Sequence, residues 1–236
     1  MQDGSGGFTD AGGRWIYRAG GLCGFGIAAG YVAIIGLYAP MGAPPHEAAA
    51  LLPYMSGHTG SWWAILALSV LTDLFFLPVA MALYAALEKL HRGAMLIAAG
   101  CLALFAVLDL AITWTNYAVL ITLSSQYAQA DLTGAPKGAI VAMAEYPAMV
   151  AFSKLLFVYN TAVPALGVFA AGWVMRRGVF PRSTAWVGMI TGVLGVLAVA
   201  GSFASLVPQA VILASLGTTI WMWLTGWRLW QLGRES

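Results

Sequence analysis

Six long apolar stretches recur along this chain, and they limit its fold more than any other feature. Each stretch reaches the length of about 20 residues that an α-helix needs to cross the hydrocarbon core of a bilayer. Only 8% of the 236 residues are charged, which is too few to cover a water-facing surface. The sequence therefore predicts an all-α, polytopic membrane bundle of six transmembrane helices, which span about residues 19–39, 61–87, 94–123, 147–175, 184–207 and 209–231.

The basic residues indicate how the chain is threaded. Nine of the eleven lysines and arginines lie before the first span, in the second and fourth connections, and at the end of the sixth span. Lys137 lies on the opposite side, and Lys154 lies within a span. Because loops rich in Lys and Arg stay in the cytoplasm, we expect both termini to be cytoplasmic. Residues 1–13 are polar and Gly-rich, and we expect them to form a flexible tail before a single domain at residues 14–236.

The connections contain further short elements. The segment HEAAALLPYM, residues 46–55, is predicted to form one or two helical turns at the outer surface. A short interfacial helix is predicted after Pro136, and a very tight turn at Pro208 is predicted between the fifth and sixth spans.

Glycines and prolines indicate how the helices pack. Two glycines four residues apart lie on one helix face and allow close backbone approach, as in the pairs Gly20/Gly24, Gly26/Gly30 and Gly188/Gly192. We expect these faces to be used within one chain. The alternative is a seam with a second copy or with another membrane protein. Pro78 and Pro164 are expected to kink the second and fourth spans.

Three ionisable side chains lie inside the predicted spans: Asp73, Asp109 and Lys154. Asp73 lies about 18 Å from the outer end of its span, near the middle of a core about 30 Å thick, and the other two reach overlapping depths. A charge at the bilayer centre costs about 2.5–3.5 kcal/mol. We therefore expect the three residues to face one another, with Lys154 paired to one aspartate and the other aspartate protonated.

Neutral polar residues extend this candidate intramembrane polar site. They are Thr113 and Asn116 on the Asp109 face at α-helical spacing, Ser69 one turn from Asp73, and Asn160 on the fourth span. The cluster predicts either a clamp that fixes helix register or a site for a proton, an ion or a polar ligand, open toward the outer face.

Several classes of protein are disfavoured. The net charge of +2, without a basic run, argues against a nucleic-acid partner. Cys23 and Cys101 lie in apolar segments and are expected to be packing thiols. His46, His58 and His91 all lie in loops, which argues against a His-ligated membrane haem. The spacing of His46, Glu47 and His58 is not diagnostic of a metal site, and solvated loop residues are favoured. We predict no cofactor and no metal. Because the chain has no recognisable catalytic motif, a non-enzymatic protein is favoured.

Two segments carry a family resemblance. GWVMRRGVFPRSTAWVGMITGVLG, residues 172–195, joins the fourth and fifth spans, and TDLFFLPVAMALYAALEKL, residues 72–90, lies in the second span. They resemble a family of bacterial six-helix integral membrane proteins of unknown function, and the likeness falls on Gly172, Arg177, Gly178, Pro181 and Arg182 and on Asp73, Pro78 and Tyr84. The resemblance implies six helices and a bacterial plasma membrane, and it implies no activity. In physical terms the first segment is a short basic turn, in which Gly178 ends one helix and Pro181 begins the next.

Three functions remain open. The polar cluster favours a protein that binds or moves a small ligand, an ion or a proton. The glycine faces favour an accessory or structural subunit of a membrane complex. A membrane-embedded enzyme that uses Asp73 or Asp109 as a general acid on a lipid-like substrate is the third hypothesis. The bilayer itself is the one partner that the composition requires. The substrate, the oligomeric state and any protein partner do not follow from the sequence.

Overall fold

The computed structural model describes residues 11–133, 136–203 and 208–235, and these residues are helical almost throughout, with no strand among them. Residues 1–10 of the predicted tail and residues 204–207 before Pro208 lie outside the described residues. The elements are α1 (Ala11–Tyr38), α2 (Ala48–Ser56), α3 (Thr59–Leu108), the π-helix η1 (Asp109–Trp114), α4 (Thr115–Thr133), α5 (Lys137–Ala151), α6 (Lys154–Met175), α7 (Arg182–Phe203) and α8 (Pro208–Glu235).

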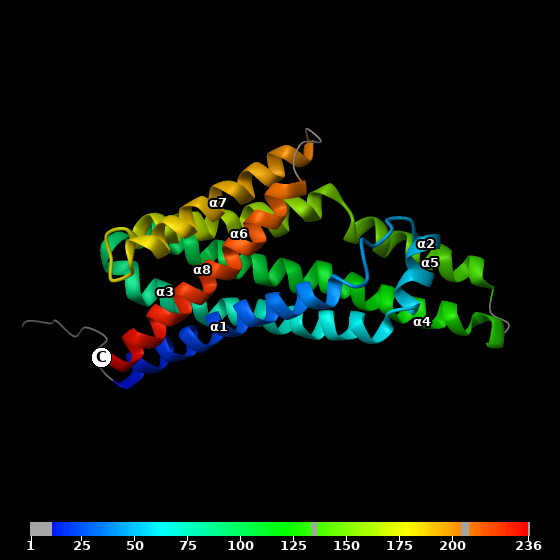
Figure 1. Ribbon diagram of the computed structural model, residues 1–236, viewed down its shortest axis with the longest axis horizontal. Helices are drawn as coiled ribbons and strands as arrows, with labels where there is room; N and C mark the ends of the chain where they lie inside the picture. The colour runs from blue at the N-terminus through cyan, green and yellow to red at the C-terminus, as the bar shows by residue number, and fades with distance from the viewer. Residues whose placement is uncertain (1–10, 134–135, 204–207, 236) are drawn as a thin grey trace, which may run out of the picture.

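α3 consists of two legs that reverse direction at His91 (Figure 1). His91 has an extended backbone (φ −161°, ψ 81°), and its Nδ1 accepts a hydrogen bond of 3.1 Å from the backbone N–H of Ala94. The imidazole therefore caps the second leg, which a side-chain acceptor commonly does at a helix start. The second leg then continues through η1 into α4. With α1, α6, α7 and α8, the two legs form a bundle of six long helices in the order that the sequence predicts.

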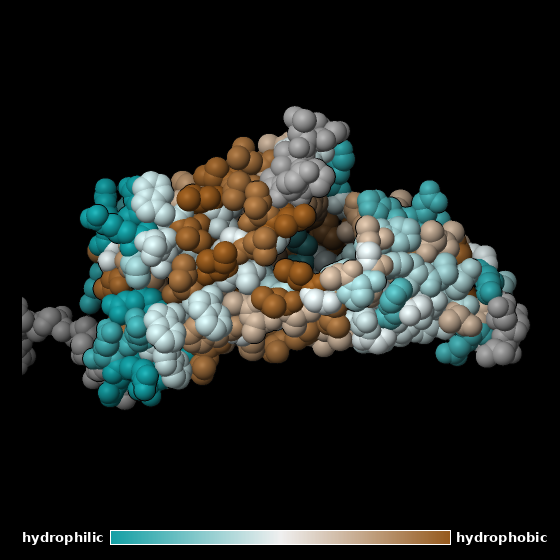
Figure 2. All heavy atoms as spheres, viewed as in Figure 1, coloured by the Kyte–Doolittle hydropathy of each residue, from teal (hydrophilic) through white to brown (hydrophobic). Residues whose placement is uncertain are grey.

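Four runs of described residues are long and apolar enough to cross a membrane: Arg14–Tyr38, Thr59–Ala130, Lys137–Met175 and Arg182–Ser202. The second run is 72 residues long and supplies both legs of α3. The sixth leg, α8, is not among these runs, and it packs against α1 and α7. Figure 2 shows brown, apolar side chains over the middle of the bundle, between a hydrophilic end and a paler region at the other end.

The protein has two hydrophobic cores rather than one. The first lies among α1, the legs of α3, α6, α7 and α8, and includes Phe76, Leu102 and Trp221. The second lies among α2, α4, α5 and the start of α3, and includes Leu52 and Trp62. We call these latter elements the cap, and Figure 1 shows that they extend beyond the ends of α7 and α8.

Two predicted span boundaries are wrong because of the cap. The helix that contains the third span, predicted to end at residue 123, continues to Thr133, and from Arg92 to Thr133 it is about 60 Å long. That length is twice the thickness of a hydrocarbon core. The fourth span, predicted at residues 147–175, is broken at Ser153, whose Oγ accepts from the Leu156 N–H at 3.1 Å and caps α6. Residues 147–151 therefore belong to α5.

The other local predictions are mostly confirmed. α2 is the short helix predicted within residues 46–55, and α5 is the helix predicted after Pro136. Met175 ends α6 and Arg182 begins α7, so the predicted basic turn lies between them. The predicted kinks are not found as breaks, since α3 and α6 continue through Pro78 and Pro164, and each proline removes only one backbone donor.

The predicted glycine faces pack within the chain. A Cβ at Gly24 of α1 would come within 2.9 Å of the Gly226 Cα of α8. Gly26 of α1 lies against Phe75 of α3, and Gly188 of α7 lies against Trp221 of α8. These contacts bear out the prediction that the close approaches are made within one chain.

We expect Gly226→Ala to lower the free energy of unfolding by about 1–3 kcal/mol, the usual cost of overpacking. The new Cβ would lie 2.9 Å from the Gly21 carbonyl oxygen and 3.1 Å from the Phe25 backbone nitrogen, and neither backbone atom can move freely. The measurement is unfolding of the purified protein in detergent. Gly36→Ala is the control, because a Cβ at Gly36 meets nothing within 4 Å. Equal stability of the two variants would contradict this account of the α1–α8 contact.

Candidate functional site

Two carboxyl groups from the two legs of α3 meet at a single indole. The Trp114 Nε1 donates to Asp73 Oδ2 at 2.9 Å and to Asp109 Oδ2 at 3.2 Å. Asp73 is 2% exposed and Asp109 is 6% exposed, so both side chains are removed from solvent and lipid. We call these two residues the carboxyl pair. Its position explains why an acidic residue is tolerated within each apolar leg.

Asn160 of α6 joins the second leg to the rest of the bundle. Its Nδ2 donates to Asp109 Oδ1 at 2.6 Å and to Thr113 Oγ1 at 2.8 Å. Both amide hydrogens are thereby used. The Asn160 Oδ1 is buried and has no hydrogen-bond partner among the described residues. A buried acceptor without a partner is costly, and this one lies next to the carboxyl pair.

The π-helix η1 brings Trp114 to Asp109. In an α-helix, residues five apart point about 140° away from each other. In a π-turn, which closes through i→i+5 hydrogen bonds, they stack on one side. This geometry places the indole beside the carboxyl of Asp109 and within reach of Asp73. π-turns of this kind often occur at functional sites.

The structure brings together some of the predicted site residues and separates others. Asp73, Asp109, Thr113 and Asn160 form one hydrogen-bonded group. Ser69 is buried one turn from Asp73, and its carbonyl oxygen accepts from Thr72 Oγ1. Asn116 donates to the Ile112 carbonyl of its own helix at 2.7 Å. The extra residue of the π-turn rotates Asn116 away from the face that α-helical spacing predicted.

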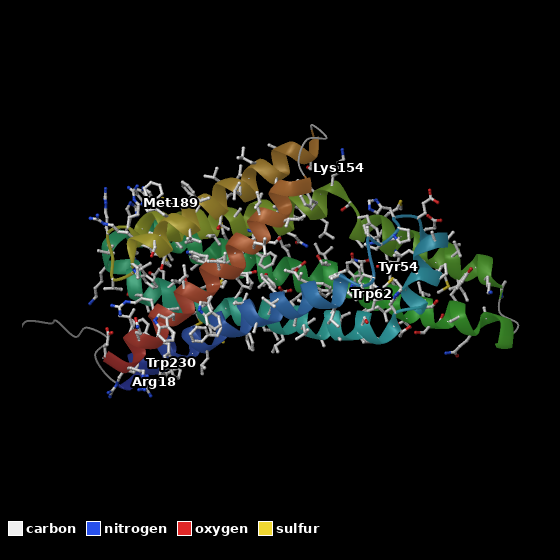
Figure 3. The ribbon with its side chains drawn as sticks, viewed as in Figure 1. Arg18, Tyr54, Trp62, Lys154, Met189 and Trp230 are labelled. Carbon is white, nitrogen blue, oxygen red and sulfur yellow. The ribbon has the colours of Figure 1, made fainter. Side chains whose placement is uncertain are left out.

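Lys154 does not reach the carboxyl pair. It is the first residue of α6, its side chain is exposed, and in Figure 3 it points away from the bundle. The predicted pairing of Lys154 with an aspartate is therefore corrected. The break at Ser153 brings Lys154 to the end of a helix, where a lysine stays in a polar environment. Hydrogen bonds from Trp114 and Asn160 stabilise the carboxyls in its place.

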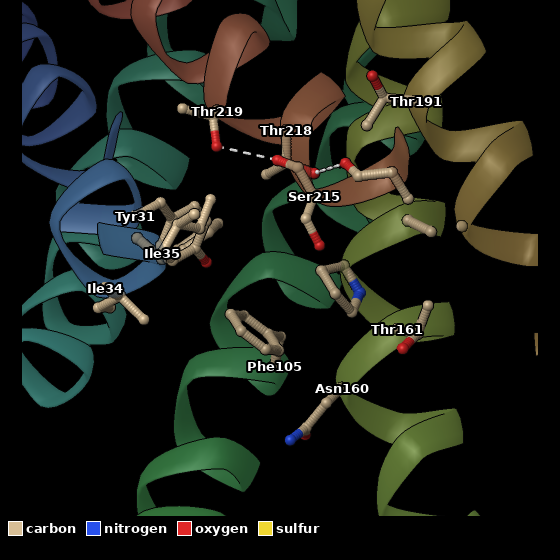
Figure 4. Close-up of a pocket in the computed structure, with 15 residues that line it drawn as sticks. Tyr31, Ile34, Ile35, Phe105, Asn160, Thr161, Thr191, Ser215, Thr218 and Thr219 are labelled. Atoms are coloured by element: carbon tan, nitrogen blue, oxygen red, sulfur yellow. Dashed lines mark hydrogen bonds between the residues drawn. The ribbon is translucent and has the colours of Figure 1, made fainter. Parts of the chain in front are cut away.

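A cavity of about 250 Å³ adjoins this group, between α1, α3, α6, α7 and α8. Asn160 and Tyr31 both line it. Figure 4 shows Asn160, Thr161 and the hydroxyls of α8 around the same space, and Figure 2 shows a hollow beside α8 on the side of the bundle. The sequence analysis did not find Tyr31, because a tyrosine in an apolar span has no distinguishing pattern.

An aromatic pair from the first core forms part of the cavity wall. The rings of Phe76 and Phe105 meet edge to face at 5.1 Å between centroids, and both residues line the cavity. Phe76 lies three residues after Asp73, and Phe105 four residues before Asp109, so both rings lie one turn nearer the basic end than the carboxyls. The two rings therefore form the part of the cavity wall that lies one turn from the carboxyl pair.

Stacked rings connect the cap to the carboxyl pair. The Trp62 ring of the second core stacks on Tyr117 at 5.5 Å, and Tyr117 lies 5.5 Å from Trp114. Trp114 in turn donates to both carboxyls. Packing in the cap thus helps to set the position of the indole.

Metal-binding clusters are not found in the described part of the chain: no group of three His, Cys, Asp or Glu side chains there could hold an ion. Cys23 and Cys101 are both free thiols.

The fold and the site define a class: a helical bundle with membrane-spanning character, a second core at one end, and a buried carboxyl pair near a cavity. The chain belongs to the family described as Domain of unknown function (DUF4386), whose model matches residues 19–231. Comparisons with curated proteins and with solved structures gave no match. The family is thus one of unknown function, in agreement with the resemblance drawn from the two sequence segments, and the site must be interpreted from its own geometry.

Proposed function

We propose that this protein is a multi-pass protein of the bacterial plasma membrane that binds, and moves, a proton or a small polar or cationic ligand at Asp73 and Asp109. The observation that carries the proposal is the buried carboxyl pair held by Trp114 and bonded by Asn160, a residue that also lines the adjoining cavity. Buried ionisable groups at membrane depth commonly mark such pathways.

The distribution of charge supports an orientation with both termini in the cytoplasm. Arg18 donates to the Gly233 carbonyl, and Arg228 donates to the Val179 carbonyl, so basic residues of both terminal helices lie at one end of the bundle. The hydrophilic end in Figure 2 is the end at which α1 begins and α8 finishes. Since basic ends remain cytoplasmic, the cap and the cavity would face the outer half of the membrane.

A membrane-embedded enzyme is a second candidate, and one observation favours it. The cavity opens on the side of the bundle, where an amphipathic molecule could enter from the bilayer, and a carboxyl that carries a proton can act as a general acid. The accessory-subunit hypothesis has less support, because the predicted glycine faces already pack within the chain.

A flux measurement tests the proposal. The protein is reconstituted into liposomes with a trapped pH-sensitive dye, and proton movement is followed under an imposed K⁺ diffusion potential and under an inward Na⁺ gradient. We expect a dye response from the wild type and a response at least about tenfold slower from Asp73→Asn/Asp109→Asn, because the double variant has no titratable proton at the site. The amide keeps the shape and the hydrogen-bonding capacity of a protonated carboxyl.

The matched control is Glu47→Gln/Glu145→Gln, which removes two exposed carboxylates near and within the cap. We expect this variant to respond like the wild type. Traces from the wild type and the double aspartate variant that cannot be told apart, under both gradients, would rule out ion or proton movement through the carboxyl pair.

A further inference from the structure

We infer that the reversal of α3 and the end of α6 form a binding site for the phosphate group of an anionic phospholipid. The site, which we call the headgroup site, is lined by Leu90, His91, Trp173, Val174 and Arg177. It lies at the basic end of the bundle, away from the carboxyl pair. The inference is therefore independent of the proposed function.

Two segments of the chain meet at the headgroup site. α3 reverses at His91, and α6 ends at Met175. A Cβ at Gly178 would lie 2.7 Å from Leu87 Cδ2 and 2.9 Å from Leu90 Cδ1, so the turn after α6 packs against the reversal. A pocket of about 20 Å³ lies between the two segments. A pocket of this size holds about one atom the size of a water oxygen, so it fits one oxygen of a phosphate group.

The polar side chains of the headgroup site are hydrogen-bond donors. The His91 Nδ1 accepts the backbone N–H of Ala94, so the neutral imidazole carries its hydrogen on Nε2, and the residue is exposed. The exposed Arg177 guanidinium has five N–H groups, and it donates to no acceptor in the described part of the chain. A phosphate group supplies acceptors and negative charge, so it complements both side chains.

Trp173 holds the two donors next to each other. The Arg177 Cζ lies 6.0 Å from the centroid of the indole, and the His91 ring meets the indole edge to face at 5.3 Å between centroids. A guanidinium at this distance from an aromatic ring gains a cation–π interaction. Tryptophan is also enriched at the level of the lipid headgroups. The donors are therefore ordered at the depth at which phospholipid phosphates lie.

The charge around the headgroup site favours an anion. Nine of the eleven lysines and arginines lie at this end of the bundle, and the acidic residues of the described chain at the same end are Glu88 and Glu235. Glu235 is already paired with Arg228 at 3.2 Å. Lys89 and Arg177 form no ion pair with any described residue. Basic pockets between spanning helices are known to bind anionic headgroups.

The apolar surface beside the headgroup site favours a lipid over a free phosphate ion. Leu166, Phe169 and Trp173 of α6 are 50%, 39% and 36% exposed. They are three and four residues apart, so they form one stripe along the helix. The stripe starts at Trp173 in the headgroup site and continues toward the middle of the bundle. An acyl chain can lie along this stripe while the phosphate group contacts Arg177.

The test measures how lipids raise the unfolding temperature of the full-length protein in a nonionic detergent, and the dependence on lipid concentration gives the affinity. The probes are dioleoyl-phosphatidylglycerol, which is anionic, and dioleoyl-phosphatidylcholine, which has the same acyl chains and no net charge. We expect the anionic lipid to bind at least about tenfold more tightly, the factor that one charge-assisted hydrogen bond supplies. This comparison needs no variant, and equal affinities for the two lipids would overturn the inference.

Two variants with the same chemical change locate the binding. Arg177→Gln should remove most of the preference for the anionic lipid, because glutamine keeps hydrogen-bond donors and loses the charge. Arg234→Gln is the matched control, since Arg234 is an exposed arginine in the last turn of α8 at the same end of the bundle, and it should keep the preference. Equal losses in the two variants would assign the binding to the net charge of the basic end and would overturn the inference.

Inorganic phosphate distinguishes a lipid headgroup from a soluble anion. Sodium phosphate in large excess, compared with sodium chloride at the same ionic strength, should neither raise the unfolding temperature by itself nor reduce the effect of the anionic lipid. Stabilisation by phosphate alone, lost in Arg177→Gln, would identify the site as one for a soluble phosphate and would overturn the assignment to a lipid.

Discussion

Replacing Trp62 by alanine is expected to lower the free energy of unfolding by about 3–5 kcal/mol, the usual cost of removing a large buried aromatic side chain. Trp62 is 1% exposed and lies at the centre of the second core. Its ring contacts Tyr38 and Tyr117 at 5.5 Å and Tyr54 at 6.3 Å between centroids. Its loss would leave a cavity where α1, α2, α3 and α4 meet. Unfolding in detergent, followed by circular dichroism, measures the effect.

The neighbouring residue supplies a matched control. Trp63 is 46% exposed, and Trp63→Ala should change the stability by no more than about 0.5 kcal/mol. Trp62→Phe should cost much less than Trp62→Ala, because it keeps a ring and removes an Nε1 that is buried without a partner among the described residues. Comparable losses in Trp62→Ala and Trp63→Ala would mean that the cap is not a packed core.

Trp114→Phe is expected to lower the stability by about 1.5–3 kcal/mol, the range for hydrogen bonds to charged groups. The substitution keeps an aromatic ring against Tyr117 and removes the Nε1–H that donates to both carboxyls. We also expect a slower dye response in the liposome measurement, because the carboxyl pair loses the donor that fixes its position. The measurements are unfolding in detergent and the liposome flux measurement on the same preparation.

Trp63→Phe is the control for this variant, since it makes the same chemical change on an exposed side chain. If Trp114→Phe matched the wild type in both measurements, the indole would not be what holds the two carboxyls together. The proposed site would then depend on Asn160 alone.

The fold could be predicted because the signal for each helix lies within a short stretch of sequence and recurs along the chain. Each long apolar stretch is helical, and the alternation of basic loops orders the helices. Two short helices of the cap, α2 and α5, were predicted, but the extent of the cap was not, because the segment 115–133 and the start of the predicted fourth span look like continuations of their neighbours. Ser153 was the available signal for the break, since a serine is a favoured residue immediately before a helix start.

The sequence predicted most residues of the site but not how their side chains are arranged. Asp73, Asp109, Thr113 and Asn160 were named from their depth in the spans, and they do meet. The π-turn could not be predicted, because the assignment of residues to helix faces assumes 3.6 residues per turn. This one deviation explains both errors of spacing: Trp114 was missed, and Asn116 was wrongly assigned to the Asp109 face.

The reversal at His91 has a consequence for how the protein is made. It joins the legs that carry Asp73 and Asp109 without an intervening loop. The two legs are therefore synthesised one directly after the other, and both aspartates reach the membrane in the same helical hairpin. A hairpin of two helices can insert into the bilayer as one unit, in which the two aspartates contact each other before either contacts lipid. Insertion as a hairpin then avoids the transfer of a single charged side chain into lipid. That transfer would cost a free energy of about 2.5–3.5 kcal/mol for each leg inserted by itself.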